Sequence, residues 1–480
     1  MLKKMRSFLV LVMLFITVTM SAQVTTATMS GKVTAQDEPI IGATIVAVHE
    51  PSGTRYGTVT NVSGQFNLQG MRTGGPYKVE ISYVGYQTAI YKGINLLLGE
   101  NYVLNVSLKE SSELLDEVVV TASKESNMKS DRAGAIMNAN RDMISNTPTI
   151  SRSISDIMRL SPQGADVGNG FAVGGGNYRQ SFVTVDGAAF NNTFGLGGNL
   201  PANGSPISLD ALEQVTVAVT PFDVRQSGFT GGAINAVTRS GDNQFRGTVY
   251  GYFNNENLRG DKVEDYKLTR SKSQYYTYGA SFGGPIIKDK LFFFVNGEYE
   301  DNVTAGSSYQ PRTSLDQEYT GNVRRPVENT IVDGNETWVG LNDMRQYLKE
   351  KYNYDPGRYN NYSVNTPAYR IMARLDWNAN LNNKLSLRFT KTHTKDSNFP
   401  SSSTSPLSAD DIYPGDTGLG IPKGKDSGRS TKYSMSFENS NYYQVRDFTS
   451  VAGEWNSRFA NGAMNNMLRF AYSYQNEPRE

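Results

Sequence analysis

The clearest pattern along this chain is a two-residue alternation of apolar and polar side chains from residue 245 onward. In "YRIMARLDWN" the apolar positions are Ile371, Ala373, Leu375 and Trp377, with charged side chains between them. The segments "KLSLRFT" and "SVAGEWNSRF" alternate in the same way. Because successive side chains of a β-strand point to opposite faces, this pattern predicts strands with one apolar and one polar face.

Seven such strands are predicted, at residues 245–254, 275–284, 291–300, 369–378, 385–395, 446–459 and 467–475. The short turns "PIIKDK", "ANLNNK" and "ANGAMNN" alternate with connections of roughly 20, 68 and 50 residues, as in outer-membrane barrels with periplasmic turns. We therefore expect residues 245–480 to form the N-terminal part of an antiparallel transmembrane β-barrel, with Phe293 and Tyr299 facing lipid.

Residues 29–110 contain shorter strands separated by Gly, Pro and Asn turns about every ten residues. This spacing predicts a small immunoglobulin-like β-sandwich. The phrases "PIIGATI", "GTVTNVSGQFNL" and "VEISYVGYQT" resemble the carboxypeptidase-regulatory-like domain, to which no catalytic residue belongs. We expect His49 to be a surface residue of one of these strands.

The stretch "ELLDEVVVTAS", residues 113–123, is a strong strand former without an obvious neighbour. The polar residues 124–149 after it are predicted to be a linker. An unpaired strand is a liability in a soluble protein, because its free backbone groups can pair with other chains. Either Val118–Val120 are a docking strand for a partner or they are the last strand of the sandwich.

Residues 150–240 predict a mixed α/β domain rich in glycine. In "SRSISDIMRLSP" the positions of Ile154, Ile157, Met158 and Leu160 indicate a short helix with Ser151 or Ser153 as its cap. The strands "SFVTVDG" and "VTVAV" follow. Asp186-Gly187 is expected to form a tight turn at a strand end, and Gly231 and Gly232 to permit close backbone packing.

Composition excludes several classes of function. The 480 residues include 47 Lys and Arg, 46 Asp and Glu, two His and no Cys. The near-neutral balance gives no nucleic-acid footprint, and the absence of Cys removes disulfides and thiolate sites. We find no catalytic constellation, metal-ligand set or cofactor motif, so no enzyme is expected. His393, expected on the polar face of its strand, is the histidine left for base chemistry.

The N-terminus has the pattern of a secretory signal peptide over residues 1–22. Lys3, Lys4 and Arg6 precede an apolar core from Phe8 to Val18, which is too short to span a membrane comfortably. The pattern predicts an exported protein.

These segments together resemble TonB-dependent outer-membrane receptors of the Oar-like group, which carry an N-terminal carboxypeptidase-regulatory-like domain. "LDEVVVTA" resembles the TonB box, and "FVTVDGAAF", "LDALEQVTV" and "SGFTGGAINAVTRSG" resemble successive motifs of the plug domain. "YGASFGGPIIKDKLFFFVNGEYE" resembles an early barrel hairpin of that group. The resemblance covers essentially the whole chain.

The resemblance implies a mainly β protein with a periplasmic sandwich, a mixed α/β plug and a barrel in outer-membrane lipid. It implies import of a nutrient by TonB-driven plug remodelling; an outer-membrane adhesion or secretion-associated scaffold is the alternative. The box-like residues are Asp116, Glu117, Val118, Val119, Val120, Thr121 and Ala122. The expected partners are the periplasmic domain of TonB, an extracellular ligand and a surface lipoprotein.

The connection at residues 301–367 is rich in aromatic and amide side chains. Trp338, Tyr352, Tyr354 and Tyr359 are candidate ligand contacts, since aromatic rings stack on sugars or line peptide sites. The alternative is that these rings pack the loop against itself.

Overall fold

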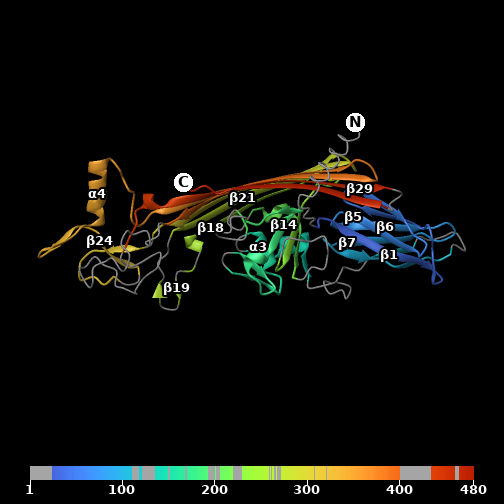
Figure 1. Cartoon of the computed structure of the whole chain (residues 1–480), viewed down its shortest axis with the longest axis horizontal. Helices are drawn as coiled ribbons and strands as arrows, with labels where there is room; N and C mark the ends of the chain where they lie inside the picture. Colours follow the sequence, from blue (N-terminus) through green and yellow to red (C-terminus); the bar gives the residue numbers. More distant parts are fainter. Residues whose placement is uncertain are drawn as a thin grey trace, which may run out of the picture.

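The structure is a computed structural model. It describes residues 24–110, 118–121, 136–149, 152–167, 170–192, 200–201, 206–219, 230–258, 260, 262–263, 266–267, 272–307, 309–319, 322–399, 434–459 and 464–480. The predicted signal peptide and residues Asp116, Glu117 and Ala122 of the box-like segment lie outside the described residues. A long curved sheet carries two smaller β-domains on one of its faces (Figure 1).

The long sheet is a seven-stranded antiparallel meander, which confirms the seven predicted strands. Its strands, in spatial and sequence order, are β18 (Arg246–Asn255), β21 (Ser273–Ile287), β22 (Leu291–Ala305), β27 (Ser363–Asn378), β28 (Asn383–Asn398), β29 (Tyr442–Phe459) and β30 (Met464–Asn476). Several strands are longer than predicted, mainly at the ends that meet the long connections. There the backbone pairing continues past the part of the sequence that alternates.

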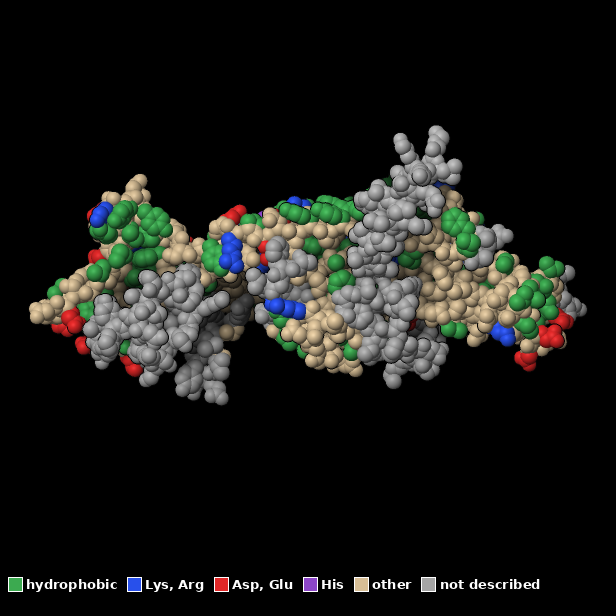
Figure 2. All heavy atoms as spheres, in the orientation of Figure 1, with side chains coloured by type: hydrophobic (Ala, Val, Ile, Leu, Met, Phe, Trp, Pro, Cys, Tyr) green, Lys and Arg blue, Asp and Glu red, His purple; other side chains and the backbone are tan. Residues whose placement is uncertain are grey.

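The apolar face of this sheet points outward and the polar face points toward the smaller domains. Ile371, Leu375 and Trp377 are 47%, 43% and 50% exposed, whereas Arg370 and Arg388 are buried. Apolar side chains line the outer surface along the sheet (Figure 2). This inverts the arrangement of a soluble sheet and fits a wall with lipid outside.

A second, five-stranded sheet lies under the middle of the long sheet (Figure 1). Its order is β11 (Ile136–Ala139), β16 (Leu212–Ala218), β17 (Ala233–Thr238), β14 (Phe182–Val185) and β15 (Ala188–Ala189). The hairpin β12 (Gly164–Asp166) and β13 (Phe171–Val173), and the short helices η1 (Tyr178–Gln180) and η3 (Leu209–Ala211), belong to the same part of the chain. We refer to this part as the plug.

Two predictions about the plug need correction. Residues 124–149 are not linker throughout, because β11 pairs with β16 over four residues and α2 (Arg141–Asn146) follows it. The helix α3 (Ile154–Met158) has Ser153 as its N-cap, as predicted, and buries Ile157. Leu160 falls beyond its end and is 38% exposed instead of sharing the buried side.

The N-terminal domain is a sandwich of two five-stranded sheets, as predicted. One joins β2 (Glu38–Pro39), β1 (Ala27–Ala35) and β5 (Gln65–Met71), with β8 (Asn101–Val103) and β9 (Val106–Ser107) beside β1. The other runs β10 (Val118–Thr121), β7 (Ala89–Leu96), β6 (Gly74–Ser82), β3 (Thr44–His49) and β4 (Thr54–Val59). Met29, Ile45, Leu68 and Ile81 are fully buried between the sheets.

The box-like strand β10 has a neighbour, contrary to the expectation that it stands alone. It lies parallel to β7, with Val118 to Thr121 opposite Ala89 to Lys92, at the edge of the sandwich. The alternative that it is the last strand of the sandwich describes this arrangement. Sequence could not decide this, because a parallel pair needs a long connection that leaves no local turn pattern.

The longest connection that the structure describes is folded. Between β22 and β27 it contains β23 (Gln310–Arg312), β24 (Val323–Val327), β25 (Ile331–Asp333), β26 (Glu336–Trp338) and α4 (Leu341–Tyr352). The remaining short elements are η4 (Glu256–Leu258), β19 (Lys262–Val263), β20 (Tyr266–Lys267) and η6 (Glu438–Ser440). Helix α4 and β24 lie at the end of the long sheet opposite the sandwich (Figure 1). No helix in the described residues is long and apolar enough to cross a membrane.

Candidate functional site at the plug and barrel wall

The Asp186-Gly187 pair forms the two-residue turn between β14 and β15, as predicted. Both residues have positive φ, 46° and 77°, and Val185 pairs with Ala188 across the turn. Such φ values are typical of tight hairpin turns and favour Asp-Gly. The Asp186 carboxylate also accepts hydrogen bonds from the backbone N–H of Thr238 at 2.9 Å and from its hydroxyl at 2.6 Å. The turn is therefore fixed to β17 as well.

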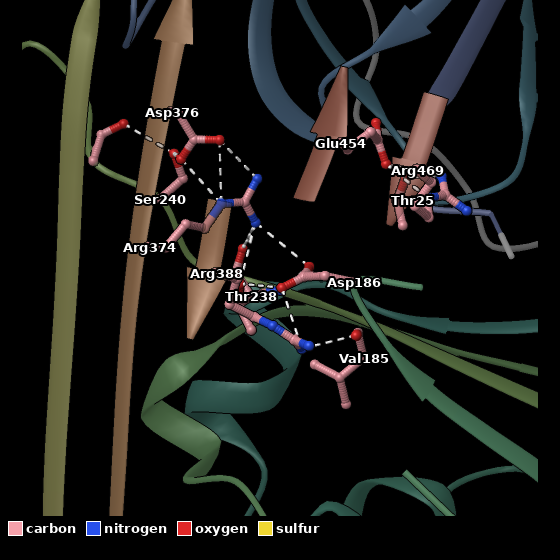
Figure 3. Close-up of polar contacts among 11 residues, drawn as sticks. Thr25, Val185, Asp186, Thr238, Ser240, Arg374, Asp376, Arg388, Glu454 and Arg469 are labelled. Carbon is pink, nitrogen blue, oxygen red and sulfur yellow. Dashed lines mark hydrogen bonds and ion pairs between the residues drawn. The ribbon is translucent and has the colours of Figure 1, made fainter. Parts of the chain in front are cut away.

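Arg374, on β27 of the barrel wall, joins this turn to the wall (Figure 3). Its guanidinium donates to the carbonyl of Thr238 at 2.7 Å and lies 3.5 Å from the Asp186 carboxylate. It also forms a forked pair with Asp376, at 2.9 to 3.2 Å. Asp376 in turn accepts a 2.5 Å hydrogen bond from Ser240. The wall therefore holds the end of β17 at several polar contacts.

A second arginine of the wall, Arg388 on β28, approaches the same turn. It donates to the Val185 carbonyl at 2.7 Å and to Ser450 at 3.0 Å, and lies 3.6 Å from the Asp186 carboxylate. Arg388 is 2% exposed, and its guanidinium lies 5.3 Å from the ring centre of Phe190. A buried cation is costly without an opposite charge, so Asp186 balances two arginines of the wall.

A further cluster ties the plug to the first strands of the wall. Glu298 of β22 accepts hydrogen bonds from Ser208 of the plug at 2.9 Å and from Tyr250 at 2.6 Å. Arg370 pairs with the same carboxylate at 3.0 Å. Glu298 and Arg370 are both buried, so this contact lies inside the wall as well.

The predicted plug glycines lie where backbones pack closely. A Cβ at Gly232 would lie 2.4 Å from Val173, a distance that real side chains do not reach. A Cβ at Gly231 would lie 3.2 Å from Gln180. Gly232 therefore has a packing reason to be glycine, at the start of β17.

The sandwich meets the wall and the plug around a polar cavity of about 250 Å³. Thr54 accepts a 2.9 Å hydrogen bond from Asn378, and Arg72 donates to the Gly241 carbonyl at 3.1 Å. On the far side, Thr25 accepts a 2.6 Å hydrogen bond from Arg469, which also pairs with Glu454 (Figure 3). These contacts join the sandwich to the wall at the end that carries the short turns.

His49 is buried, not on the surface as predicted. It is 5% exposed, packs edge-on against Tyr77 and shares a 2.7 Å hydrogen bond with Ser52. Burial, with a smaller contribution from Arg72, lowers the pKa of His49 to about 2. The alternation of β3 places this side chain on the inner face of the sandwich, and His49 is therefore a neutral structural residue.

His393 also lies on another face than predicted. It shares the outward face of β28 with Leu387 and Phe389, stacks on Tyr369 and lies 2.9 Å from the Asp447 carboxylate. The prediction placed His393 on the polar face of this strand. The period of two along β28 places it with the apolar residues.

The four aromatic candidates of the outer loop do not form one group. Tyr359 is 8% exposed, and its hydroxyl donates to Glu328 and Asn342, both at 3.1 Å, so it packs the loop against itself. Tyr352 and Tyr354 are 60% and 47% exposed. Trp338 lies beside two arginines, Arg312 and Arg325.

The sequence prediction missed Arg374, Asp376 and Arg388 as partners of the plug. A signal was present, since all three lie on the polar face of the predicted strands. That face could equally have met water in an open channel, and the sequence does not show which plug residue opposes them.

Comparison with known proteins agrees with this architecture. Residues 237–473 match the family described as outer membrane beta barrel domain, and residues 28–109 match the carboxypeptidase regulatory-like domain. The TonB-dependent transporter Oar of Myxococcus xanthus is 25% identical over 300 residues, covering 60% of this chain and 26% of that protein. The TonB-dependent receptor SusC of Bacteroides thetaiotaomicron is 29% identical over 281 residues, covering 55% and 26%. The chain thus spans about a quarter of the length of these curated relatives.

Among solved structures, the ferric enterobactin receptor of Pseudomonas aeruginosa matches with a TM-score of 0.41 and 14% identity. The match covers 72% of this chain and 42% of that one. The sheet with its apolar outer face, the plug on its inner face and the two domain matches agree with one another. The chain is similar to the TonB-dependent receptors, with an outer membrane β-barrel domain in the outer membrane and a carboxypeptidase regulatory-like domain in the periplasm.

Proposed function

We propose that this chain belongs to a transporter that imports a nutrient across the outer membrane, with TonB supplying the force that remodels the plug. One observation carries the proposal: a short strand at a periplasmic sheet edge precedes a plug whose far side is fixed to the barrel wall. Strand β10 is that edge strand, and the contacts of Asp186 with Arg374 and Arg388 fix the plug. The named relatives are a TonB-dependent transporter and a TonB-dependent receptor.

The order of elements determines which part of the plug a pull on the box-like strand reaches first. The first plug strand after β10 is β11, which lies at an edge of the plug sheet and pairs with β16 over four residues. The contacts with Arg374 and Arg388 involve β14 and β17, on the other side of β16. A pull would therefore detach β11 while β14 and β17 stay on the wall, which opens a path without releasing the whole plug.

TonB would bind β10 by strand addition, in which backbone hydrogen bonds supply affinity and side-chain pockets supply register. Because β10 is paired with β7, a pull on β10 acts first on the sandwich. Force reaches β11 only after β10 has left β7. We therefore propose that TonB replaces β7 as the partner of β10.

A deletion of residues 117–122 tests this function. The full chain in detergent micelles is titrated with the purified periplasmic domain of TonB from the same organism. We expect binding to weaken at least about tenfold, since the strand that would be added to TonB is gone. A deletion of the same length at residues 124–129 is the control and should leave binding unchanged.

Equal binding by the two deletion variants would contradict the proposal. An adhesion or secretion-associated scaffold, the alternative function, would not depend on residues 117–122 at all.

A further inference from the structure

The folded outer loop between β22 and β27 contains an arginine cluster that the import function does not use. We propose that Arg312, Arg324 and Arg325, together with Trp338, bind the carboxylate of an acidic saccharide. The proposal rests on the proposed function only in that this loop faces the cell exterior and so meets ligands first. The wall, the plug and the sandwich take no part in it.

Arg312 is the buried centre of the cluster. It is 5% exposed and donates to two backbone carbonyls, that of Arg325 at 2.9 Å and that of Leu315 at 3.0 Å. Its remaining nitrogen, Nη2, is buried without a hydrogen-bond partner among the described residues. A buried donor without a partner is costly, and more so when the group is charged, so an acceptor on a ligand would remove that cost.

Two aromatic rings lie between Arg312 and Arg325. The Arg312 guanidinium is 5.3 Å from the ring centre of Tyr319 and 5.2 Å from that of Trp338. The Arg325 guanidinium is 5.8 Å and 5.3 Å from the same two rings. The electron-rich faces of Tyr and Trp attract cations, and here they bring two like charges close together.

The electrostatics of this cluster favour an anion. Burial and the nearby Arg325 lower the pKa of Arg312. In the described part of the chain, Nε of Arg324, like Nη2 of Arg312, is buried without a hydrogen-bond partner. Arg324 lies over Tyr309 instead, with 3.5 Å between guanidinium and ring centre. A ligand carboxylate would accept hydrogen bonds from these two nitrogens of Arg312 and Arg324.

The shape of the groups indicates the class of ligand. A planar guanidinium matches the two oxygens of a carboxylate. Trp338 is half-buried at the end of the hairpin of β25 and β26, each three residues long. A shift of this short hairpin would open Nη2 of Arg312 and turn the Trp338 ring toward the ligand, where it can stack on a sugar ring. Carboxylate and sugar ring occur together in a uronic acid.

The fluorescence of tryptophan provides the test. The chain has three tryptophans, and Trp377 and Trp455 lie on the outward face of the wall. The full chain in detergent micelles is titrated with tetragalacturonate, with neutral cellotetraose and with tetraglutamate. We expect tetragalacturonate to change the Trp338 emission, and cellotetraose to have no effect at the same concentration.

Matched variants locate the binding. Arg324→Gln and Arg325→Gln, each half-buried, should weaken tetragalacturonate binding about ten- to a hundredfold, the loss of one charged hydrogen bond. Arg358→Gln is the control, because this exposed arginine of the same loop already pairs with Glu438. It should leave binding unchanged. Arg312→Gln should also weaken binding, with the melting temperature reporting whether the loop still folds.

Three results would overturn the proposal: equal response to cellotetraose, equal binding by Arg324→Gln and Arg358→Gln, or tighter binding of tetraglutamate, which would assign the site to an acidic peptide. The test is separate from that of import. The deletion of residues 117–122 should keep tetragalacturonate binding, and Arg324→Gln should keep TonB binding.

Discussion

At the scale of single residues, Asp186 has two roles, one through its backbone and one through its carboxylate. Its backbone conformation makes the turn between β14 and β15, and its carboxylate faces Arg374 and Arg388 of the wall. Arg374 has a second carboxylate partner in Asp376, whereas the carboxylate that the structure places nearest to Arg388 is that of Asp186. Arg388 therefore depends most on the Asp186 charge.

Asp186→Asn should keep the turn and remove the charge, because Asn also tolerates positive φ. We expect a destabilisation of about 3–5 kcal/mol, the usual cost of removing one partner of a buried pair. Urea unfolding in detergent, with hydrogen exchange of β14 and β15, measures it. Asp333→Asn, at an exposed loop carboxylate, is the control. If the amides of β14 exchange at the wild-type rate in Asp186→Asn, the charge of Asp186 does not contribute to holding β14 on the wall.

At the scale of elements, the box-like strand β10 is held at the edge of the sandwich by its pairing with β7. The four-residue register is short, and β10 lies at the sheet edge. An edge strand is the part of a sheet most open to exchange with another strand. Under the proposed function, the sandwich would thus protect β10 from unwanted pairing until TonB binds it.

A disulfide between Val120→Cys and Tyr91→Cys tests whether β10 must leave β7 for TonB to bind. The two positions are opposite each other in the pair of strands. The chain has no other cysteine. Oxidation should weaken binding of the TonB periplasmic domain at least about tenfold, since β10 can no longer leave β7, and reduction should restore it. Val48→Cys with Arg55→Cys, paired across β3 and β4, is the control. Unchanged binding after oxidation would mean that TonB adds to the outer edge of β10.

At the scale of the whole molecule, one sheet separates two environments. Its outer face is apolar (Figure 2), and its inner face carries the polar and charged side chains that hold the plug and the sandwich. The folded outer loop lies at one end of the sheet and the sandwich at the other (Figure 1). The molecule thus has an outer side, a membrane band and a periplasmic side.

An arginine on the outer face tests the membrane band. Leu375→Arg should lower folding stability in lipid vesicles by about 2–4 kcal/mol, the cost of a cation facing lipid near the bilayer middle. Urea titration of the vesicle-bound protein gives this value. Val332→Arg, on an exposed loop strand, is the matched control and should have little effect. Equal stability of both variants would place Leu375 outside the lipid band.

The sequence by itself determined the features that depend on local pattern. A period of two gives a strand and its two faces, so the seven wall strands and the orientation of Ile371 and Leu375 were predictable. The alternation of short turns and long connections predicted which end of the wall faces the periplasm. The Asp186-Gly187 pair predicted a tight turn at that position. Each of these follows from residues adjacent in the chain.

Only the tertiary structure decided which of these parts meet. Asp186 and Arg374 are 188 positions apart, and no local pattern records their contact. For the same reason the burial of His49 was mispredicted, and the partner of β10 and the packing of the outer loop were left open. Each depends on segments that approach only when the chain is compact, and their contacts are set by packing and charge balance, which periodicity does not encode.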